Sequence, residues 1–227
     1  GVLAPVVGTW VSLRRLAYMG DAMSHSLLGG VALAFAWFGT AAVLPGALVA
    51  GIFMAVVIHL LSQNRRIAHD SIIAVVGSGM FAFGVLALGK VDTSVSLTHF
   101  LFGQLLTVNT LDMWITFALT IGSLFFVWFR FEDLKIATFD RDHATQVGVR
   151  AQRLDAAMLI LLAICVVVCL STVGTVLTVS LLITPTSTAR LFFDRVGSIT
   201  RAAVVIGLTE VLAGFIVSYH ANLAPGP

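Results

Sequence analysis

The chain has 227 residues, of which 59% are hydrophobic and 11% charged, and its mean hydropathy is +1.02. A soluble domain carries about 25% charged residues, so the composition excludes an ordinary soluble protein. The formal net charge of +2 indicates no binding of nucleic acid. The apolar stretches are close to 20 residues long, as in membrane helices, and do not alternate like barrel strands. We therefore expect a single all-α domain over residues 1–227, a polytopic transmembrane helical bundle.

Eight apolar segments are expected to cross the membrane. In chain order they are residues 1–13, 21–38, 47–61, 71–89, 111–129, 156–171, 174–190 and 201–219. A further apolar piece, residues 97–108, is too short to span about 30 Å at about 1.5 Å per residue, so we expect it to be re-entrant or interfacial. Because the chain opens inside an apolar segment and ends without a polar tail, we expect native residues to be missing at both ends.

The positions of the basic residues support this membrane topology. Twelve of the 13 lysines and arginines fall on one side of the membrane if residues 97–108 do not cross, and only Lys90 falls on the other. The positive-inside rule makes the first side the cytoplasm. The twelve are Arg14, Arg15, Arg65, Arg66, Arg130, Lys135, Arg141, Arg150, Arg153, Arg190, Arg195 and Arg201.

An acidic and an imidazole side chain lie deep in the second segment. Asp21 and His25 are four residues apart, so on a helix they share a face. A carboxylate and an imidazole on one face can bind a divalent transition metal. His25 lies ten residues beyond Arg15, about 15 Å of helix, near the middle of the bilayer. Ionisable groups are costly at that depth, which favours a metal site at Asp21 and His25 over a capping Asp and a hydrogen-bonded core His. Ser24, the residue before His25, is a candidate to line the pathway of the metal ion.

Other polar residues are weaker candidates for the same pathway. Glu210 reaches a similar depth, nine residues beyond Arg201. His99, in the short apolar piece, either meets incoming metal or caps a turn. His59 lies close to the cytoplasmic side, and we expect it to be structural.

Two further clusters lie in the predicted hairpin of residues 156–190. Thr184 and Pro185 belong to a run in which proline is expected to break the helix and hydroxyls to bond the freed backbone groups; this run could line the pathway. Cys165 and Cys169 are one turn apart, and thiolates at that spacing suit zinc or copper(I). A buried cysteine is more often an apolar filler, and the pair implies no disulfide framework.

The polar stretch of residues 130–153 contains a predicted short helix. Asp140 can cap its first turn, and Gly148 can end it after Ala144. A compact helix between two spans could dock on another protein and transmit a rigid-body movement. The alternative is a solvated loop with balanced charge, since the stretch holds five basic and four acidic residues.

Four ordered segments resemble the zinc and manganese permeases of ABC importers, the ZnuB and MntB type. Residues 20–32 (GDAMSHSLLGGVA) are similar to the family's Asp/His helix, and residues 97–103 (LTHFLFG) to its short element. Residues 139–149 (FDRDHATQVGV) resemble its cytoplasmic loop, and residues 181–191 (LLITPTSTARL) its hairpin. The chain departs from the pattern at Gly29, where the family often has proline, and after Pro185, where it often has two alanines. Glu210 is not part of the pattern.

The resemblance implies a permease subunit in a bacterial cytoplasmic membrane. It would pair with a second copy of itself, with cytoplasmic ATPase subunits and with an extracellular metal-binding protein. Its substrate would be manganese or zinc, or iron, with no cofactor bound permanently. The ATPase-coupling residues carried over are Asp140, Asp142, Ala144, Val147 and Gly148.

Absent motifs narrow the function further. There is no G-x-x-x-x-G-K-[ST] loop, so ATP hydrolysis must come from a partner, and no H-E-x-x-H of a membrane protease. Two alternatives stay open: a secondary transporter that uses Asp21, His25 and Glu210 as a proton relay, and a membrane enzyme with a metal at Asp21 and His25. One chain supplies only two ligands, so we expect two copies related by a twofold axis to supply four. Co-purification of an ATPase would favour the importer.

Overall fold

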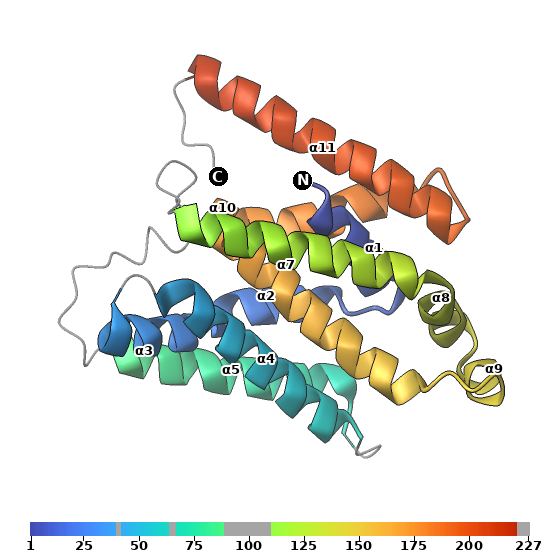
Figure 1. Cartoon of the computed structure of the whole chain (residues 1–227), viewed down its shortest axis with the longest axis horizontal. Helices are drawn as coiled ribbons and strands as arrows, with labels where there is room; N and C mark the ends of the chain where they lie inside the picture. Colours follow the sequence, from blue (N-terminus) through green and yellow to red (C-terminus); the bar gives the residue numbers. More distant parts are fainter. Residues whose placement is uncertain (40–41, 64–66, 89–109, 222–227) are drawn as a thin grey trace.

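The computed structural model describes residues 1–39, 42–63, 67–88 and 110–221, and this part of the chain is helical throughout, without strands (Figure 1). The helices are α1 (Leu3–Leu13), α2 (Ala17–Ser26), α3 (Leu28–Phe38), α4 (Val43–Ser62), α5 (His69–Leu88), α7 (Thr110–Phe129), α8 (Phe131–Phe139), α9 (Arg141–Gln146), α10 (Ala151–Arg190) and α11 (Val196–Ala221). The all-α bundle expected from composition is confirmed. The re-entrant piece, residues 97–108, lies outside the described residues.

Five of the described helices are long and apolar enough to cross a membrane: α4, α5, α7, α10 and α11. The predicted second span differs from expectation, since it begins at Ala17 and is divided at Leu27 into α2 and α3. Together α2 and α3 measure about 33 Å, enough to cross a bilayer. The count of eight crossings stays a prediction, because α1, α2 and α3 are each too short to cross alone.

Helix α10 reverses direction at Gly174. That residue has φ of 83° and ψ of 176°, values outside the helical region. A straight helix of 40 residues would hold its ends about 60 Å apart. Yet Asp155 near its start bonds Arg14, and Arg190 at its end bonds Ser12, so both ends of α10 lie at the C-terminal end of α1. The predicted hairpin is therefore confirmed, and Figure 1 shows its second half returning toward α8 and α9.

The predicted helix break at Pro185 is wrong. Helix α10 continues through Pro185 to Arg190. Proline removes one backbone bond from the helix, and here the buried ring packs beside Gly207 of α11. The neighbouring Thr186 hydroxyl donates to the carbonyl oxygen of Pro5 in α1, at 3.4 Å. The hydroxyl therefore links two helices.

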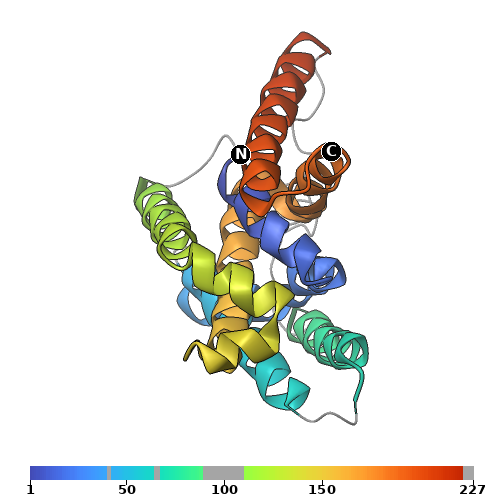
Figure 2. The ribbon, with the colours of Figure 1, turned by 90° about the vertical axis from the view of Figure 1, so that its right-hand side faces the viewer.

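The hydrophobic core surrounds the first half of α10, which lies centrally among the other helices in Figure 2. Its residues from Met158 to Leu170 are almost all buried, and α1, α2, α4 and α11 contact this helix. Close packing depends on glycine at two crossings. A side chain at Gly8 would overlap the carbonyl of Leu182, and one at Gly30 would overlap Ala50. Small residues let membrane helices approach each other in this way.

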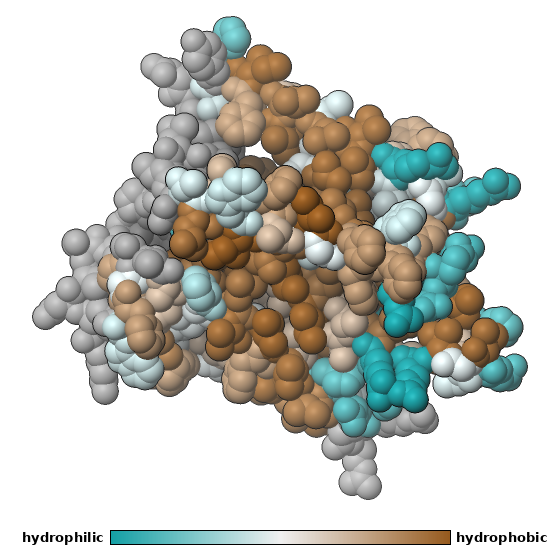
Figure 3. Space-filling view, in the orientation of Figure 1, coloured by the Kyte–Doolittle hydropathy of each residue, from teal (hydrophilic) through white to brown (hydrophobic). Residues whose placement is uncertain are grey.

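One end of the bundle is polar. Hydrophilic residues gather there over α8, α9 and the adjoining helix ends, while the rest of the visible face is largely hydrophobic (Figure 3). We call this the basic end, because the described lysines and arginines lie at the helix ends and connections that meet there. The predicted polar stretch 130–153 is more ordered than expected, since it contains α8 as well as α9.

Candidate functional site

Asp21 and His25 lie on one face of α2, as the spacing predicts. The Nε2 atom of His25 is 3.6 Å from Oδ1 of Asp21, and the two side chains are 51% and 48% exposed. On the other face of the same helix, Met19, Met23 and Ser24 are buried in the bundle. The core therefore fixes the rotation of α2, and the acid and the imidazole point away from this chain's interior.

The spacing of these two donors suits a metal ion. With metal–ligand bonds of about 2.1 Å, donor atoms 3.6 Å apart subtend an angle of about 120° at the ion, close to tetrahedral. Small rotations of either side chain would also reach other geometries. Within the described part of the chain, no group of three or more His, Cys, Asp or Glu residues could hold a metal. Among the described residues, this position thus offers two donor side chains.

The side chains around Asp21 and His25 are either apolar or already hydrogen-bonded to the backbone. The His25 ring meets the Phe81 ring of α5 edge to face, with centroids 6.3 Å apart. The hydroxyl of Ser24 is buried and donates to the carbonyl of Gly20, 2.8 Å away. Its role as a pathway-lining residue stays a prediction. At Gly20, α2 contacts Leu182 in the second half of α10, so the hairpin lies directly behind the metal pair.

The remaining sequence candidates lie apart from this pair. Glu210 belongs to α11, which packs against α1 and α10, and among the described residues it joins no group of three His, Cys, Asp or Glu side chains that could hold a metal. His99 lies outside the described residues. In the second half of α10, Thr184 is exposed and Pro185 buried. Their roles stay predictions.

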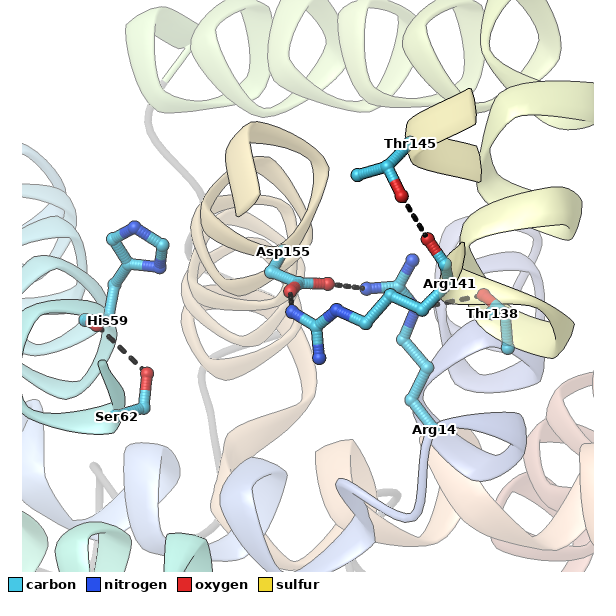
Figure 4. Close-up of polar contacts among 7 residues, drawn as sticks. All are labelled: Arg14, His59, Ser62, Thr138, Arg141, Thr145 and Asp155. Atoms are coloured by element: carbon cyan, nitrogen blue, oxygen red, sulfur yellow. Dashed lines mark hydrogen bonds and ion pairs between the residues drawn. The ribbon is translucent and has the colours of Figure 1, made fainter. Parts of the chain in front are cut away.

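His59 and the cysteines have ordinary surroundings. His59 is half-buried in the last turn of α4, and its carbonyl accepts a bond from Ser62 (Figure 4). Cys165 and Cys169 are both free thiols buried in the core around α10. Burial among aliphatic side chains agrees with a role as apolar filler.

Helix α9 has the two ends that the sequence predicts. The Asp140 carboxylate accepts a bond from the backbone N–H of His143 at 2.8 Å, which caps the helix. After the helix, Gly148 has φ of 84°, and the N–H of Val149 donates to the carbonyl of Ala144 at 2.8 Å. This is the Schellman arrangement, in which glycine avoids the steric penalty of the left-handed region.

The exposed side of α9 is free to meet a partner. Ala144 is fully buried against the core, so it holds the helix to the bundle. Asp142 and Val147 are exposed, and so is Phe139 just before the cap. One apolar anchor beneath and a mixed polar and apolar surface above suit a helix that docks into another protein.

A polar network that sequence reasoning missed joins α9 to the bundle. Asp155 accepts a bond from Arg14 at 2.7 Å through Oδ1, and Oδ2 pairs with Arg141 (Figure 4). Arg14 also donates through Nε to Thr138 of α8, at 3.0 Å. Burial lowers the pKa of the Arg14 guanidinium, and the charge of Asp155 opposes that shift. No sequence spacing connects positions 14, 141 and 155; a lone acid at the start of an apolar segment was the only signal.

These features define a class: a polytopic helical membrane protein with a half-exposed acid–imidazole pair on one helix and a capped, exposed short helix at its basic end. The model of the ABC 3 transport family matches residues 1–227, and the chain belongs to this family. It is 36% identical to the manganese transport system membrane protein MntC of Halalkalibacterium halodurans, over all of this chain and 77% of that protein. It is 33% identical to the chelated iron transport system membrane protein YfeD of Yersinia pestis, over all of this chain and 76% of that one.

A solved structure has the same fold. PsaBC from Streptococcus pneumoniae, in complex with Fab, superposes with a TM-score of 0.85 at 34% identity, covering all of this chain and 81% of that one. The resemblance seen in the four sequence segments therefore extends over the whole chain.

Proposed function

We propose that the chain is the membrane-spanning permease subunit of an ABC importer that moves a divalent transition metal, manganese or zinc or else iron, into the cytoplasm by alternating access. The observation that carries this is the Asp21–His25 pair, set at metal-binding distance on a face of α2 that this chain leaves uncovered. Membership in the ABC 3 transport family and relatives named for manganese and iron transport support it.

The metal site is shared between two copies. A half-exposed carboxylate beside an imidazole near the bilayer centre would be costly against lipid. A second copy related by a twofold axis covers this face and supplies its own Asp21 and His25. Four donors replace much of the ion's water shell and still allow release. The same copies swing between outward-open and inward-open forms.

The other partners follow from the two ends of the bundle. The basic end is cytoplasmic by the positive-inside rule, in a bacterial inner membrane, and α9 docks there on an ATPase subunit. The ATPase hydrolyses ATP, so this subunit is a transport component and carries no permanent cofactor. An extracellular metal-binding protein delivers the ion at the opposite end.

The choice of metal rests on chemistry and on relatives. An Asp and a His bind both manganese and zinc, and intrinsic affinity favours zinc. Geometry and the delivering protein must therefore select the ion. We favour manganese, because relatives that match the whole chain are named for manganese transport.

Uptake in proteoliposomes tests the proposal. The permease is reconstituted with its ATPase and binding protein, and entry of radioactive manganese is followed with and without ATP. Asp21→Ala and His25→Ala should abolish ATP-driven uptake at matched protein level, whereas His59→Ala, a matched histidine away from the pair, should transport normally. Normal uptake by either site variant contradicts the site, and uptake driven by a proton gradient without ATPase favours a secondary transporter.

A further inference from the structure

A single carboxylate holds together three segments that are far apart in the sequence. Asp155, in the first turns of α10, pairs with Arg14 at the end of α1 and with Arg141, the first residue of α9. The side chain of Arg14 is only 10% exposed and that of Arg141 is 64% exposed. Asp155 thus bridges a buried and a surface cation, and Figure 4 shows its two carboxylate oxygens each joined to one of the two guanidinium groups.

Arg14 is also close in the chain to α2, the helix that carries Asp21 and His25. Only Arg14, Arg15 and Leu16 separate α1 from α2. The N–H of Leu16 donates to the carbonyl of Val11 at 2.8 Å, and the N–H of Arg15 to that of Ser12 at 3.2 Å. These two bonds form a Schellman motif at the end of α1.

This turn is stiff. Arg15 has φ of 59°, and it is the one residue other than glycine with positive φ in the described part of the chain. Glycine normally fills this position, because a side chain there is strained. Arg15 itself is exposed, so what joins α2 to the last turn of α1 is the pair of backbone bonds made by Arg15 and Leu16.

We propose that Asp155 is a positioning residue that couples movement of α9 to the metal-binding helix α2. The inference rests on the proposed function, since it assumes that an ATPase moves α9. The route runs from Arg141 through the Asp155 carboxylate to Arg14, and from there across the Arg15 turn to α2. Thr138, bonded to Arg14, brings α8 into the same unit. When α9 is displaced, the paired charges resist separation, and α1 and α2 move with it.

The test removes the charge of Asp155 and keeps the shape of its side chain. Asp155→Asn should keep the membrane level and the binding of the ATPase, but lower the number of metal ions transported per ATP at least tenfold. Asp155→Glu, which restores the charge, should recover at least half of the wild-type ratio. Asp133→Asn is the matched control: it breaks a pair with Arg130 of the same 2.7 Å length, but one confined to the start of α8. It should leave the ratio unchanged.

A second variant distinguishes a loss of coupling from misfolding. Arg141→Gln acts on the exposed partner and leaves the bond between Asp155 and Arg14 in place, so it should also lower the ratio. The proposal is overturned if Asp155→Asn or Arg141→Gln couples like wild type. It is equally overturned if uptake falls only in step with protein level or ATPase binding, which marks a merely structural role. Failure of the wild-type permease to bind an ATPase or to take up manganese would refute the proposed function instead.

Discussion

Mixing wild-type and His25→Ala copies tests whether the metal site is shared. In pairs of the variant, two of four donors are absent. Removal of an outer partner of a metal ligand alone lowers affinity about 10–100-fold, so loss of two direct ligands should lower uptake at limiting metal by more than about 100-fold. Pairs of one wild-type and one variant copy retain three donors. A loss of about tenfold or more is expected for them as well.

The expected numbers separate a shared site from independent ones. With equal amounts and random pairing, about a quarter of the pairs are wild type in both copies and about half are mixed. A shared site therefore predicts total uptake of about a quarter of wild type, rising slightly with residual activity of mixed pairs. Two independent sites predict about half.

The assay uses two differently tagged permeases expressed together, with manganese uptake measured below saturation. Mixed pairs isolated by both tags in sequence are also reconstituted alone, which removes the assumption of random pairing. A mixture with His59→Ala serves as the control and should transport fully. Mixed pairs that retain about half of the wild-type rate would refute the reasoning that Asp21 and His25 of two copies form one site.

Four further predictions concern helix α9, the turn before α2 and Glu210. Ala144→Leu adds volume at a fully buried position on the inner side of α9, and it should reduce ATPase association and uptake together. Unchanged pull-down of the ATPase and unchanged uptake would count against α9 as the docking helix. Gly148→Val forces a β-branched residue to a φ of 84° and should destabilise the end of α9 by about 1–2 kcal/mol, seen as faster amide exchange there, whereas Asp142→Asn, on the exposed side, should leave exchange unchanged. Glu210→Gln should leave uptake within about twofold of wild type, because in the part of the chain that the structure describes Glu210 forms no metal-binding group with Asp21 and His25; a loss comparable to that of Asp21→Ala would place Glu210 in the pathway. At the turn before α2, Arg15→Gly should be tolerated and Arg15→Val should lower the thermal unfolding midpoint, since only glycine accepts a φ of 59° without strain; equal midpoints would show that the turn is not strained.

The sequence alone determined those features that depend on residues close together in the chain, namely helix lengths, helix faces and helix caps. Helices form from bonds between residues four apart, so the length of an apolar stretch predicted α4, α5 and α7 to within a few residues. The same period placed Asp21 and His25 on one face. The cap at Asp140 and the stop at Gly148 depend on neighbours within four residues, and both were predicted correctly.

Only the tertiary structure decided how these parts meet. The break in α10 lies at Gly174, because glycine alone adopts that φ freely, whereas the helix continues through Pro185 with its ring packed beside Gly207. The pairing of Asp155 with Arg14 and Arg141 spans more than a hundred residues on one side and 14 on the other. No periodicity encodes such contacts, because they depend on how whole helices pack. The outward direction of the metal pair was likewise set by which face of α2 the core buries, and that choice is made by the neighbouring helices.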